Sequence, residues 1–567
     1  MLELETLDRA ISAPSVESGK ETLTIRGERL TISGIASVGA GAPVRLADDS
    51  ETYRRMQASC DFITKALENN RPIYGVTTNF GGMADRVIPT DAAAALQNNL
   101  LWSHKAATGA RLPAVDVRAG MLLRANSLAV GISGIRREIV QRFETFLNAG
   151  AVPHVYEFGS IGASGDQVPL SYISGSLIGL HPHFKVDLNG QELDCLSVLN
   201  RLGLSPIRLT AKEGLALING TSVTTGIAVN CVDRARKMLA LTMATHALFI
   251  QGLLGSNQAF HPFIHDHKAH PGQRWSAQQM LNLLDGSRLV QDHLNGKREH
   301  RSGHLIQDRY SVRCLPQFMG PIVDGIAQIA RQVETEASSV TDNPLIDAAS
   351  DAVYHCGNFL AQYIGTGMDQ LRYHLGMMAK HVDVQIALLV APEFNNGLPP
   401  SLVGNPQRPI NTGLKALQLT ANSIMPMISF YGNSIADRFP THAEQFNQNI
   451  NSQGFGSASL ARRSVELFEQ YAAVALMFAV QAVDLRAREH EGHYDARRCL
   501  SPATSKLYEA VRHATGRPVS ADRPFLLDDS DYFIDEQVAS ILADITSGGR
   551  IHEAVRETLS SLETHRA

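Results

Sequence analysis

The sequence predicts a mainly α-helical protein, in which a long central helical bundle carries a smaller N-terminal region. Apolar residues recur at spacings of three and four in run after run, which is the period of one helix face. Several of these runs are long and almost free of charge, as expected of helices buried on most sides in a bundle or between subunits. No repeat, low-complexity tract or linker divides the chain. We therefore expect one large helical body with an N-terminal cap.

The N-terminal part is predicted to begin with a small hairpin. The stretch "TLTIRGERLTIS", residues 22–33, alternates apolar and polar side chains, which is typical of strands. Further on, Ile135, Ile139, Phe143 and Leu147 follow a helical spacing, and Gly150 then predicts a helix end. Comparable runs predict helices near 114–130, 213–253, 320–339, 358–391, 411–425, 460–487 and 534–562. We expect three parts: an N-terminal region (1–212), the long-helix bundle (213–492) and a C-terminal helical region (493–567).

Composition narrows the class of partner. The chain has 567 residues, 44% of them hydrophobic, with 51 basic and 56 acidic side chains and a net charge of -5. Without a long Lys/Arg run, nucleic acid and anionic membranes are not expected as partners, and a small molecule is more plausible. The apolar stretch 471–483 is shorter than the roughly 20 residues that a membrane span needs. It is predicted to be a buried core helix.

Location and metal content follow from cysteine and histidine usage. The six cysteines are dispersed without a CxxC pair, and the start "MLELETLDRA" lacks the pattern of a secretory signal. Both observations favour the reducing cytoplasm. The best metal candidate is "HPFIHDHKAH", with His261, His265, His267 and His270, but prolines bracket it and no cysteine joins it. We expect a polar loop there and no metal.

The segment "GSIGASGDQVPL", residues 159–170, places three very small residues, Ala163, Ser164 and Gly165, in a row. A tight turn that caps a following helix is the simpler interpretation of this motif alone. The other interpretation is chemical. If the backbone bends sharply, the Gly165 amide nitrogen can attack the Ala163 carbonyl carbon, and loss of water turns the Ser164 side chain into an exocyclic methylene. The product, a methylidene-imidazolone (MIO), is a strong electrophile.

This segment resembles the signature of the aromatic amino acid ammonia-lyases, which comprise histidine, phenylalanine and tyrosine ammonia-lyases and related aminomutases. The resemblance extends through "YGVTTNFGG", "GLALINGT", "QDRYSVRCLPQ", "SVTDNPLI", "GNF" and "NQNINSQG", in the family's order and spacing. It is strongest to the bacterial phenylalanine ammonia-lyases. It implies an autocatalytically formed MIO cofactor and no metal, with the MIO and lid loops in the N-terminal region.

The resemblance also implies the reaction, which is elimination of ammonia from an aromatic L-amino acid to give a trans-arylacrylate of the cinnamate type. The substrate amine would add to the methylene derived from Ser164, with attack by the aromatic ring as the alternative. Tyr74, in the lid loop, would take the β-proton, and Arg313 would pair with the carboxylate. Glu444 is the best candidate to handle the amine. The implied catalytic residues are Tyr74, Ala163, Ser164, Gly165, Asn219, Tyr310 and Arg313. The implied substrate-binding residues are Ser103, His104, Leu215, Gln307, Asn343, Phe359, Lys415, Glu444 and Gln448.

Four departures from the family pattern bear on the lid and the substrate. Asn79 replaces a lid glycine, and asparagine tolerates a left-handed backbone best after glycine. Gln167 replaces a leucine beside the cofactor. The pair Ser103-His104 is typical of histidine lyases, yet Gln448 stands where those enzymes carry a glutamate. Because Ser103 empties space beside the substrate ring and His104 adds a hydrogen-bonding group, we expect a lyase for ring-substituted aryl-alanines.

Three alternatives stay open: a histidine ammonia-lyase that produces urocanate, an aromatic aminomutase, and a catalytically dead scaffold. The resemblance further implies a homotetramer whose active sites combine three subunits. Tyr74 and Arg313 are therefore predicted to meet between chains.

Overall fold

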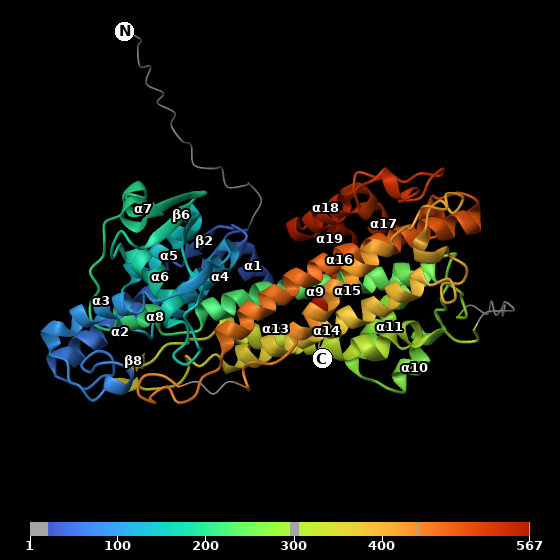
Figure 1. Ribbon diagram of the computed structural model, residues 1–567. Helices are drawn as coiled ribbons and strands as arrows, with labels where there is room; N and C mark the ends of the chain where they lie inside the picture. Colours follow the sequence, from blue (N-terminus) through green and yellow to red (C-terminus); the bar gives the residue numbers. More distant parts are fainter. Residues whose placement is uncertain (1–20, 295–304, 439–441, 566–567) are drawn as a thin grey trace, which may run out of the picture.

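The computed structural model describes residues 21–294, 305–438 and 442–565 and shows an elongated, mainly helical molecule, as predicted. Figure 1 shows the N-terminal region at one end, long helices running away from it, and the C-terminal helices α17 to α19 along one side of the bundle. Within the described residues, no helix combines the length and the apolarity that crossing a bilayer requires.

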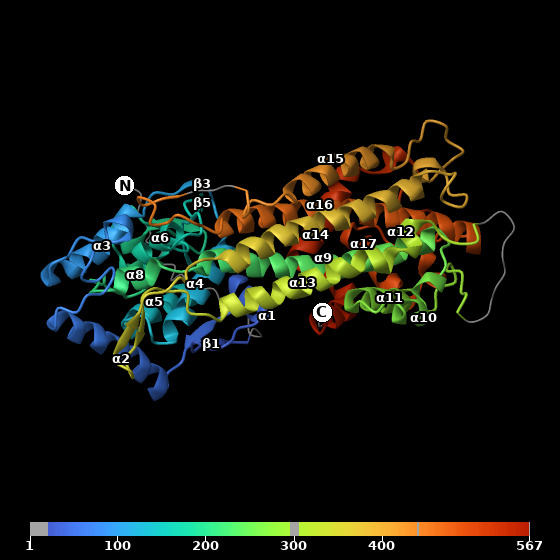
Figure 2. The same ribbon diagram turned by 90° about the horizontal axis from the view of Figure 1, so that it is seen from below.

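Six helices form the bundle, and Figure 2 shows them running side by side along its length. They are α9 (Ser222–Gly252), α11 (Pro271–Leu284), α13 (Leu315–Ala337), α14 (Gln362–Val390), α15 (Lys415–Tyr431) and α16 (Gly454–Glu491). The apolar stretch 471–483 lies inside α16 and is buried throughout, which confirms the predicted core helix. The C-terminal helices are α17 (Pro502–Ala514), α18 (Ile534–Ser547), α19 (Arg550–Ala554) and α20 (Arg556–Glu563).

The helix predicted over 213–253 is interrupted at Asn219, one of the expected catalytic residues. It divides into α8 (Glu213–Ile218) and α9, because Asn219 takes an extended backbone (φ −87°, ψ 99°). At Gly220 the backbone packs so closely on Arg124 and Thr341 that a side chain would not fit. The helix predicted over 534–562 is likewise divided, into α18, α19 and α20, with Gly548 in the left-handed region at the first break.

The predicted N-terminal hairpin is wrong. Strand β1 (Leu23–Ile25) pairs in parallel with β2 (Val44–Leu46), and helix α1 (Ile32–Gly39) lies between them in the chain. The second half of the supposed hairpin forms no strand: residues 28–31 are irregular, and α1 begins at Ile32, where Thr31 caps it by accepting a hydrogen bond from Gly34 N at 3.2 Å. The apolar residues of α1 then follow the helical period and are buried.

The remaining N-terminal elements form the region that contains the loop carrying Ser164. They are α2 (Ser50–Glu68), α3 (Ala93–Ser103), β3 (Thr108–Arg111), α4 (Ala114–Ala129), α5 (Arg137–Ala149), β4 (Ala151–Pro153), β5 (Tyr156–Phe158), α6 (Gln167–Ile178), β6 (Lys185–Leu188), β7 (Gln191–Asp194) and α7 (Cys195–Arg201). Strands β4, β6 and β7 form an antiparallel sheet, and β3 pairs with β5. Gly150 ends α5 in the left-handed region, as predicted (φ 68°). Strands β8 (Leu345–Asp347) and β9 (Ala352–Tyr354) form a separate hairpin.

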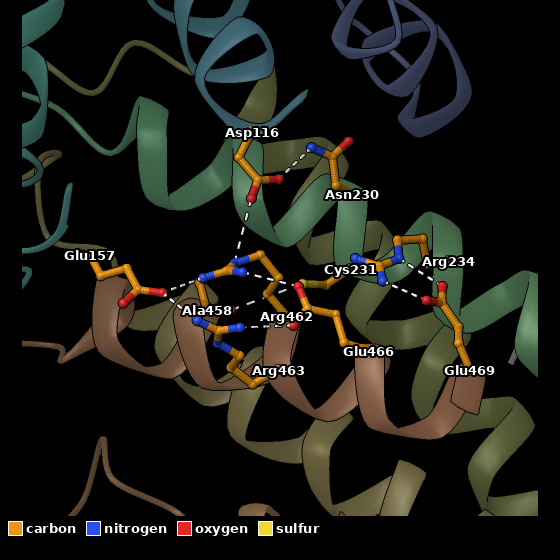
Figure 3. Close-up of polar contacts among 10 residues, drawn as sticks. All are labelled: Asp116, Glu157, Asn230, Cys231, Arg234, Ala458, Arg462, Arg463, Glu466 and Glu469. Atoms are coloured by element: carbon orange, nitrogen blue, oxygen red, sulfur yellow. Dashed lines mark hydrogen bonds and ion pairs between the residues drawn. The ribbon is translucent and has the colours of Figure 1, made fainter. Parts of the chain in front are cut away.

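A network of charged side chains joins this region to the bundle (Figure 3). Arg462 of α16, only 5% exposed, donates to Glu157 of β5 at 2.8 Å and lies 3.7 Å from the buried Asp116 of α4. Arg463 also binds Glu157, at 3.0 Å. Burial raises the pKa of Asp116 to about 6, while the amide of Asn230 and the charge of Arg462 oppose that rise. Glu157 lies in β5, which ends just before the loop 159–166. The network therefore fixes one end of that loop to α16.

Candidate active site

Left-handed glycines shape the loop 159–166. Gly162 and Gly165 have φ of 65° and 71°, values that residues with a Cβ rarely adopt. At Gly165 a Cβ would also overlap the carbonyl group of Gly220. The next residue, Asp166, donates its backbone N–H to the same carbonyl oxygen at 2.6 Å, and its buried carboxylate accepts from Thr224 of α9. The loop is therefore bent sharply at Gly165 and held there.

Ser164 receives two amide donors from distant parts of the chain. Asn219 Nδ2 donates to the backbone oxygen of Ser164 at 3.0 Å, and Gln448 Nε2 donates to its hydroxyl oxygen at 2.9 Å. Asn219 Oδ1 is buried and has no hydrogen-bond partner among the described residues. A buried acceptor of this kind costs free energy unless something donates to it, and a ligand amine is a suitable donor.

These contacts fit the internal cyclisation that the motif suggests. The bend brings Ala163, Ser164 and Gly165 into a tight turn, and the missing side chain leaves the Gly165 nitrogen uncrowded. The carbonyl of Gly165 accepts from Ser160 Oγ at 3.0 Å, so the turn is fixed on both sides. The residues present therefore suit an MIO group.

A cavity of about 310 Å³ opens in front of Ser164. This volume is at the lower end of the range for small-molecule sites. The residues lining it are Tyr74, Ser164, Gln167, Leu215, Asn219, Asn343, His355, Cys356, Phe359 and Asn447. Six of the expected site residues thus meet at one cavity within a single chain, and Gln448 joins them through its contact with Ser164.

Tyr74 is held at the cavity by its hydroxyl and its backbone. Its phenolic oxygen accepts the backbone N–H of Gly81 at 2.8 Å, and its own N–H donates to His355 Nε2 at 3.3 Å. Burial raises the pKa of Tyr74 above its usual range, and the nearby Glu444 raises it further. The hydrogen bond from the Gly81 N–H lowers the pKa of Tyr74, because it stabilises the phenolate, the form in which Tyr74 can act as a base.

Glu444 lies on the other side of Gly81 from Tyr74. Its carboxylate packs against Gly81, where a side chain would collide with it. Glu444, Gln445 and Phe446 all have positive φ (49°, 52° and 64°), so this turn is strained. Burial raises the pKa of Glu444, and the positive charge available on His104 partly offsets that effect. A carboxyl group with a raised pKa suits proton exchange with a substrate amine.

Ser103 and His104 stand at the C-terminal end of α3 and do not line the cavity in front of Ser164. Both side chains contact the carbonyl oxygen of Leu100, Ser103 Oγ at 3.0 Å and His104 Nδ1 at 2.8 Å. Since a carbonyl only accepts, Nδ1 carries the proton in neutral His104 and Nε2 is left as an acceptor. The charge of His104 acts on Glu444, whose pKa it lowers against the effect of burial.

Four expected site residues lie at the opposite end of the bundle: Gln307, Tyr310, Arg313 and Lys415. Helix α12 (Tyr310–Arg313) contacts α14 near its far end, where Gln385 Nε2 donates to Ser311 O at 2.7 Å. A rise of about 1.5 Å per residue puts Gln385 roughly 35 Å along α14 from Gln362, which follows the cavity residue Phe359. In Figure 2, α12 and α6 lie at opposite ends of the molecule. A single chain therefore does not bring Arg313 to Ser164.

Comparison with known proteins decides the family. The family model "Aromatic amino acid lyase" matches residues 30–513. The chain belongs to the aromatic amino acid lyase family. It is 59% identical over 561 residues to a phenylalanine ammonia-lyase of Nostoc punctiforme, covering 99% of each chain. It is 51% identical over 548 residues to an aromatic ammonia-lyase of Loktanella atrilutea, covering 96% of this chain and all of the relative. The structure of tyrosine aminomutase from Streptomyces globisporus superposes with a TM-score of 0.84 at 30% identity, covering 95% and 99% of the two chains.

As a member of this family the protein is an ammonia-lyase, an enzyme that breaks a carbon–nitrogen bond. The family resemblance and the mainly helical fold expected from the sequence are thus confirmed. Relatives at 59% and 51% identity are phenylalanine-type and aromatic ammonia-lyases.

Four cavity residues of this aromatic amino acid lyase were not among the expected site residues: Gln167, His355, Cys356 and Asn447. Each is close in sequence to a recognised motif. Gln167 follows "GASGD", His355 and Cys356 precede "GNF", and Asn447 precedes Gln448. Cys356 also donates its backbone N–H to the side-chain oxygen of Asn343 at 2.7 Å. Adjacency to a motif is the signal by which the sequence could have identified them.

The histidine-rich loop at 261–270 makes local contacts. His261 Nδ1 accepts from the backbone N–H of Phe263, which caps α10 (Pro262–Asp266). His265 lies between the Ala259 carbonyl and the Gln273 amide, while His267 Nδ1 lies 2.7 Å from Phe263 O. Among the described residues, no group of three or more His, Cys, Asp or Glu side chains is arranged to hold a metal ion.

Proposed function

We propose that this enzyme eliminates ammonia from phenylalanine-type L-amino acids, including ring-substituted ones, and releases the trans-arylacrylate. The observation that carries the choice of substrate is the neutral amide of Gln448, 2.9 Å from the Ser164 hydroxyl. An amide offers no charge to pair with an imidazolium, whereas a phenyl ring needs none. The names of the relatives at 59% and 51% identity support the same substrate class.

We further propose that Ala163, Ser164 and Gly165 cyclise with loss of two waters to the MIO group. That group supplies an electrophile that makes the substrate amine a better leaving group. The chain's own residues do the rest: Tyr74 accepts the β-proton, helped by the Gly81 N–H, and Asn219 Oδ1 offers an acceptor beside the cavity. Arg313 binds the substrate carboxylate through its planar fork of donors.

Histidine is the second candidate substrate, and His104 is the observation in its favour. Its Nε2 is left as an acceptor of the kind that an imidazole N–H needs, at the end of α3 and outside the cavity lining of this single chain. An aminomutase would share the catalytic residues and differ in its product, a β-amino acid.

The assembly we propose is a homotetramer in the cytoplasm with active sites shared between chains. Tyr310 is 71% exposed, and Leu419, Met427 and Phe430 of α15 are 67%, 47% and 69% exposed. Exposed apolar side chains in this number on one helix favour burial against another subunit. The division at residues 212 and 492 belongs to this proposal as well.

The test of the substrate is a comparison of kcat/KM for phenylalanine, methoxylated phenylalanines, tyrosine and histidine, with product analysis for β-amino acids. Dominance of histidine would overturn the first proposal. Intact-mass measurement should show a deficit of two waters, located in a peptide containing Ala163, Ser164 and Gly165. The Ser164→Ala variant should be inactive, and it should not show the full deficit of two waters, because it has no side-chain hydroxyl to eliminate.

Shared sites are tested by mixing subunits. Tyr74→Phe and Arg313→Ala should each be inactive alone. Unfolding and refolding the two together should restore part of the activity, since some sites then combine an intact Tyr74 with an intact Arg313. Mixtures that stay inactive would contradict the sharing of sites.

A further inference from the structure

Three polar side chains are buried in the apolar core of the bundle, far from the cavity at Ser164. They are His246 of α9 and His381 and Gln385 of α14, with exposed fractions of 0%, 4% and 0%. Their neighbours on α9 include Met243, Ala247 and Phe249, all fully buried. Polar groups in such a setting cost free energy unless they are hydrogen-bonded to one another, so the arrangement of their bonds is informative.

The three side chains form a single hydrogen-bonded series. His381 Nδ1 lies 2.9 Å from His246 Nε2, and His246 Nδ1 lies 2.7 Å from Gln385 Oε1. Gln385 Nε2 in turn donates to the backbone oxygen of Ser311 at 2.7 Å. The ring of His381 stacks on Phe318 of α13, with centroids 4.9 Å apart and an angle of 21° between the planes.

The last acceptor of the series, the backbone oxygen of Ser311, fixes the direction of every hydrogen bond in it. Ser311 O only accepts, so the amide nitrogen of Gln385 faces it and the amide oxygen faces His246. His246 Nδ1 must then carry a proton. Burial lowers the pKa of His246 well below its usual value, so the ring is neutral and its Nε2 accepts from His381 Nδ1. Each donor therefore points along the series toward Ser311.

Ser311 belongs to the four-residue helix α12, which also carries Tyr310 and Arg313. A helix this short is not stable by itself and needs contacts from its surroundings. The Arg313 guanidinium stacks on the Tyr310 ring at 4.5 Å, and Arg313 Nε has no hydrogen-bond partner among the described residues. The bond from Gln385 thus joins α12 directly to the rigid bundle core, between the two residues that the substrate is expected to meet.

We infer that His246, His381 and Gln385 are positioning residues, which set the orientation of α12 and thereby aim Arg313 at the substrate carboxylate. This inference rests on the proposed function, in which Arg313 binds that carboxylate. It assigns a role to three residues remote from the cofactor-forming loop. Disturbing the series should weaken the binding of carboxylates more than it slows the chemical step.

The first test replaces Gln385 by methionine, which has a similar shape but neither donates nor accepts usefully. Its matched control is Gln251→Met, because Gln251 is also fully buried in the bundle but donates to Thr504 of α17 at 2.9 Å. Both variants should be less stable than the wild type. Only Gln385→Met should raise the KM for phenylalanine and the inhibition constant of trans-cinnamate, by about tenfold, with kcat changed less. The inhibition constant of 2-phenylethylamine, which lacks a carboxylate, should stay within about twofold in both.

The second test keeps the inference falsifiable if Gln385→Met does not fold. His381→Asn retains a donor for His246 Nε2, whereas His381→Leu removes it. The leucine variant should show the raised KM, and the asparagine variant should restore it to near the wild-type value.

Equal kinetic effects of Gln385→Met and Gln251→Met, or of the two His381 variants, would overturn the inference. If the wild type does not deaminate phenylalanine or its ring-substituted analogues, the proposed function fails instead. The two failures are therefore distinguishable.

Discussion

The side-chain amide of Gln448 donates a hydrogen bond to the hydroxyl of Ser164 at 2.9 Å, across 284 positions of sequence. This contact places the residue that departs from the histidine-lyase pattern directly on the residue that is to form the electrophile. The identity of one side chain, amide or carboxylate, therefore sets the charge that a substrate ring meets there.

Gln448→Glu should shift the preference of the enzyme toward histidine. A carboxylate at this point pairs with an imidazolium and offers nothing to a phenyl ring, and one such pairing is worth about tenfold or more in relative kcat/KM. The measurement is kcat/KM for histidine and for phenylalanine in both enzymes. Gln141→Glu, at an exposed position of α5, adds the same charge away from the site and should leave the ratio unchanged. An unchanged ratio in Gln448→Glu would argue against this role of Gln448.

Gly165→Ala should abolish activity. The bend requires a left-handed backbone at this position, which alanine rarely adopts, and the new Cβ would overlap the Gly220 carbonyl. The bend that brings the residue-165 nitrogen to Ala163 is therefore lost. The control is Gly203→Ala, since Gly203 has φ 68° but open space around its Cα. It should cost about 1 kcal/mol of stability and no activity. Intact mass reports the outcome, because Gly165→Ala should show no deficit of two waters.

Glu157→Gln should destabilise the protein noticeably. It removes the charge that both Arg462 and Arg463 contact, and the 5%-exposed Arg462 then keeps only Glu466 at 3.0 Å and Asp116 at 3.7 Å among its ion pairs with the described residues. Weakening a hydrogen bond to a buried charge that keeps other partners costs about 2 kcal/mol. Glu192→Gln is the matched control: its pair with Arg111 is about half exposed, so the cost should be at most about 1 kcal/mol. Thermal unfolding of the two variants compares them, and equal melting temperatures would contradict the role of the network.

Stability should fall as the pH is lowered from about 6.5 to about 4, partly because of His374. Burial lowers the pKa of His374 to about 4. In the unfolded chain His374 has an ordinary pKa and binds more protons than in the folded protein across this window. The contribution of His374 to stability is therefore fully present above about pH 6.5 and is lost as the pH falls toward 4. His374→Asn should therefore flatten the dependence of melting temperature on pH. The exposed His513→Asn should leave the slope as in the wild type, and an equally steep slope in His374→Asn would refute the assignment.

The local pattern of the chain was sufficient to predict most of the bundle. The spacing of apolar residues predicted α5, α13, α14 and α16, and Gly150 predicted the end of α5, because a helix is built from contacts three and four residues apart. The hairpin at 22–33 failed for the opposite reason. The partner of β1 is β2, with Leu23 opposite Val44, and strand pairing over such a distance leaves no local signature.

The sequence by itself determined the family, the cofactor-forming tripeptide as a candidate, and the identities of Tyr74, Asn219 and Gln448, because motif letters persist wherever the chain folds. Only the tertiary structure decided that these residues share one cavity, that His355 and Cys356 join them, and that Arg313 lies at the other end of the same chain. It also placed Ser103 and His104 at the end of α3, outside the lining of that cavity. The physical reason is that proximity across hundreds of residues depends on how rigid helices roughly 35 Å and longer are packed, a property that no short window of sequence contains.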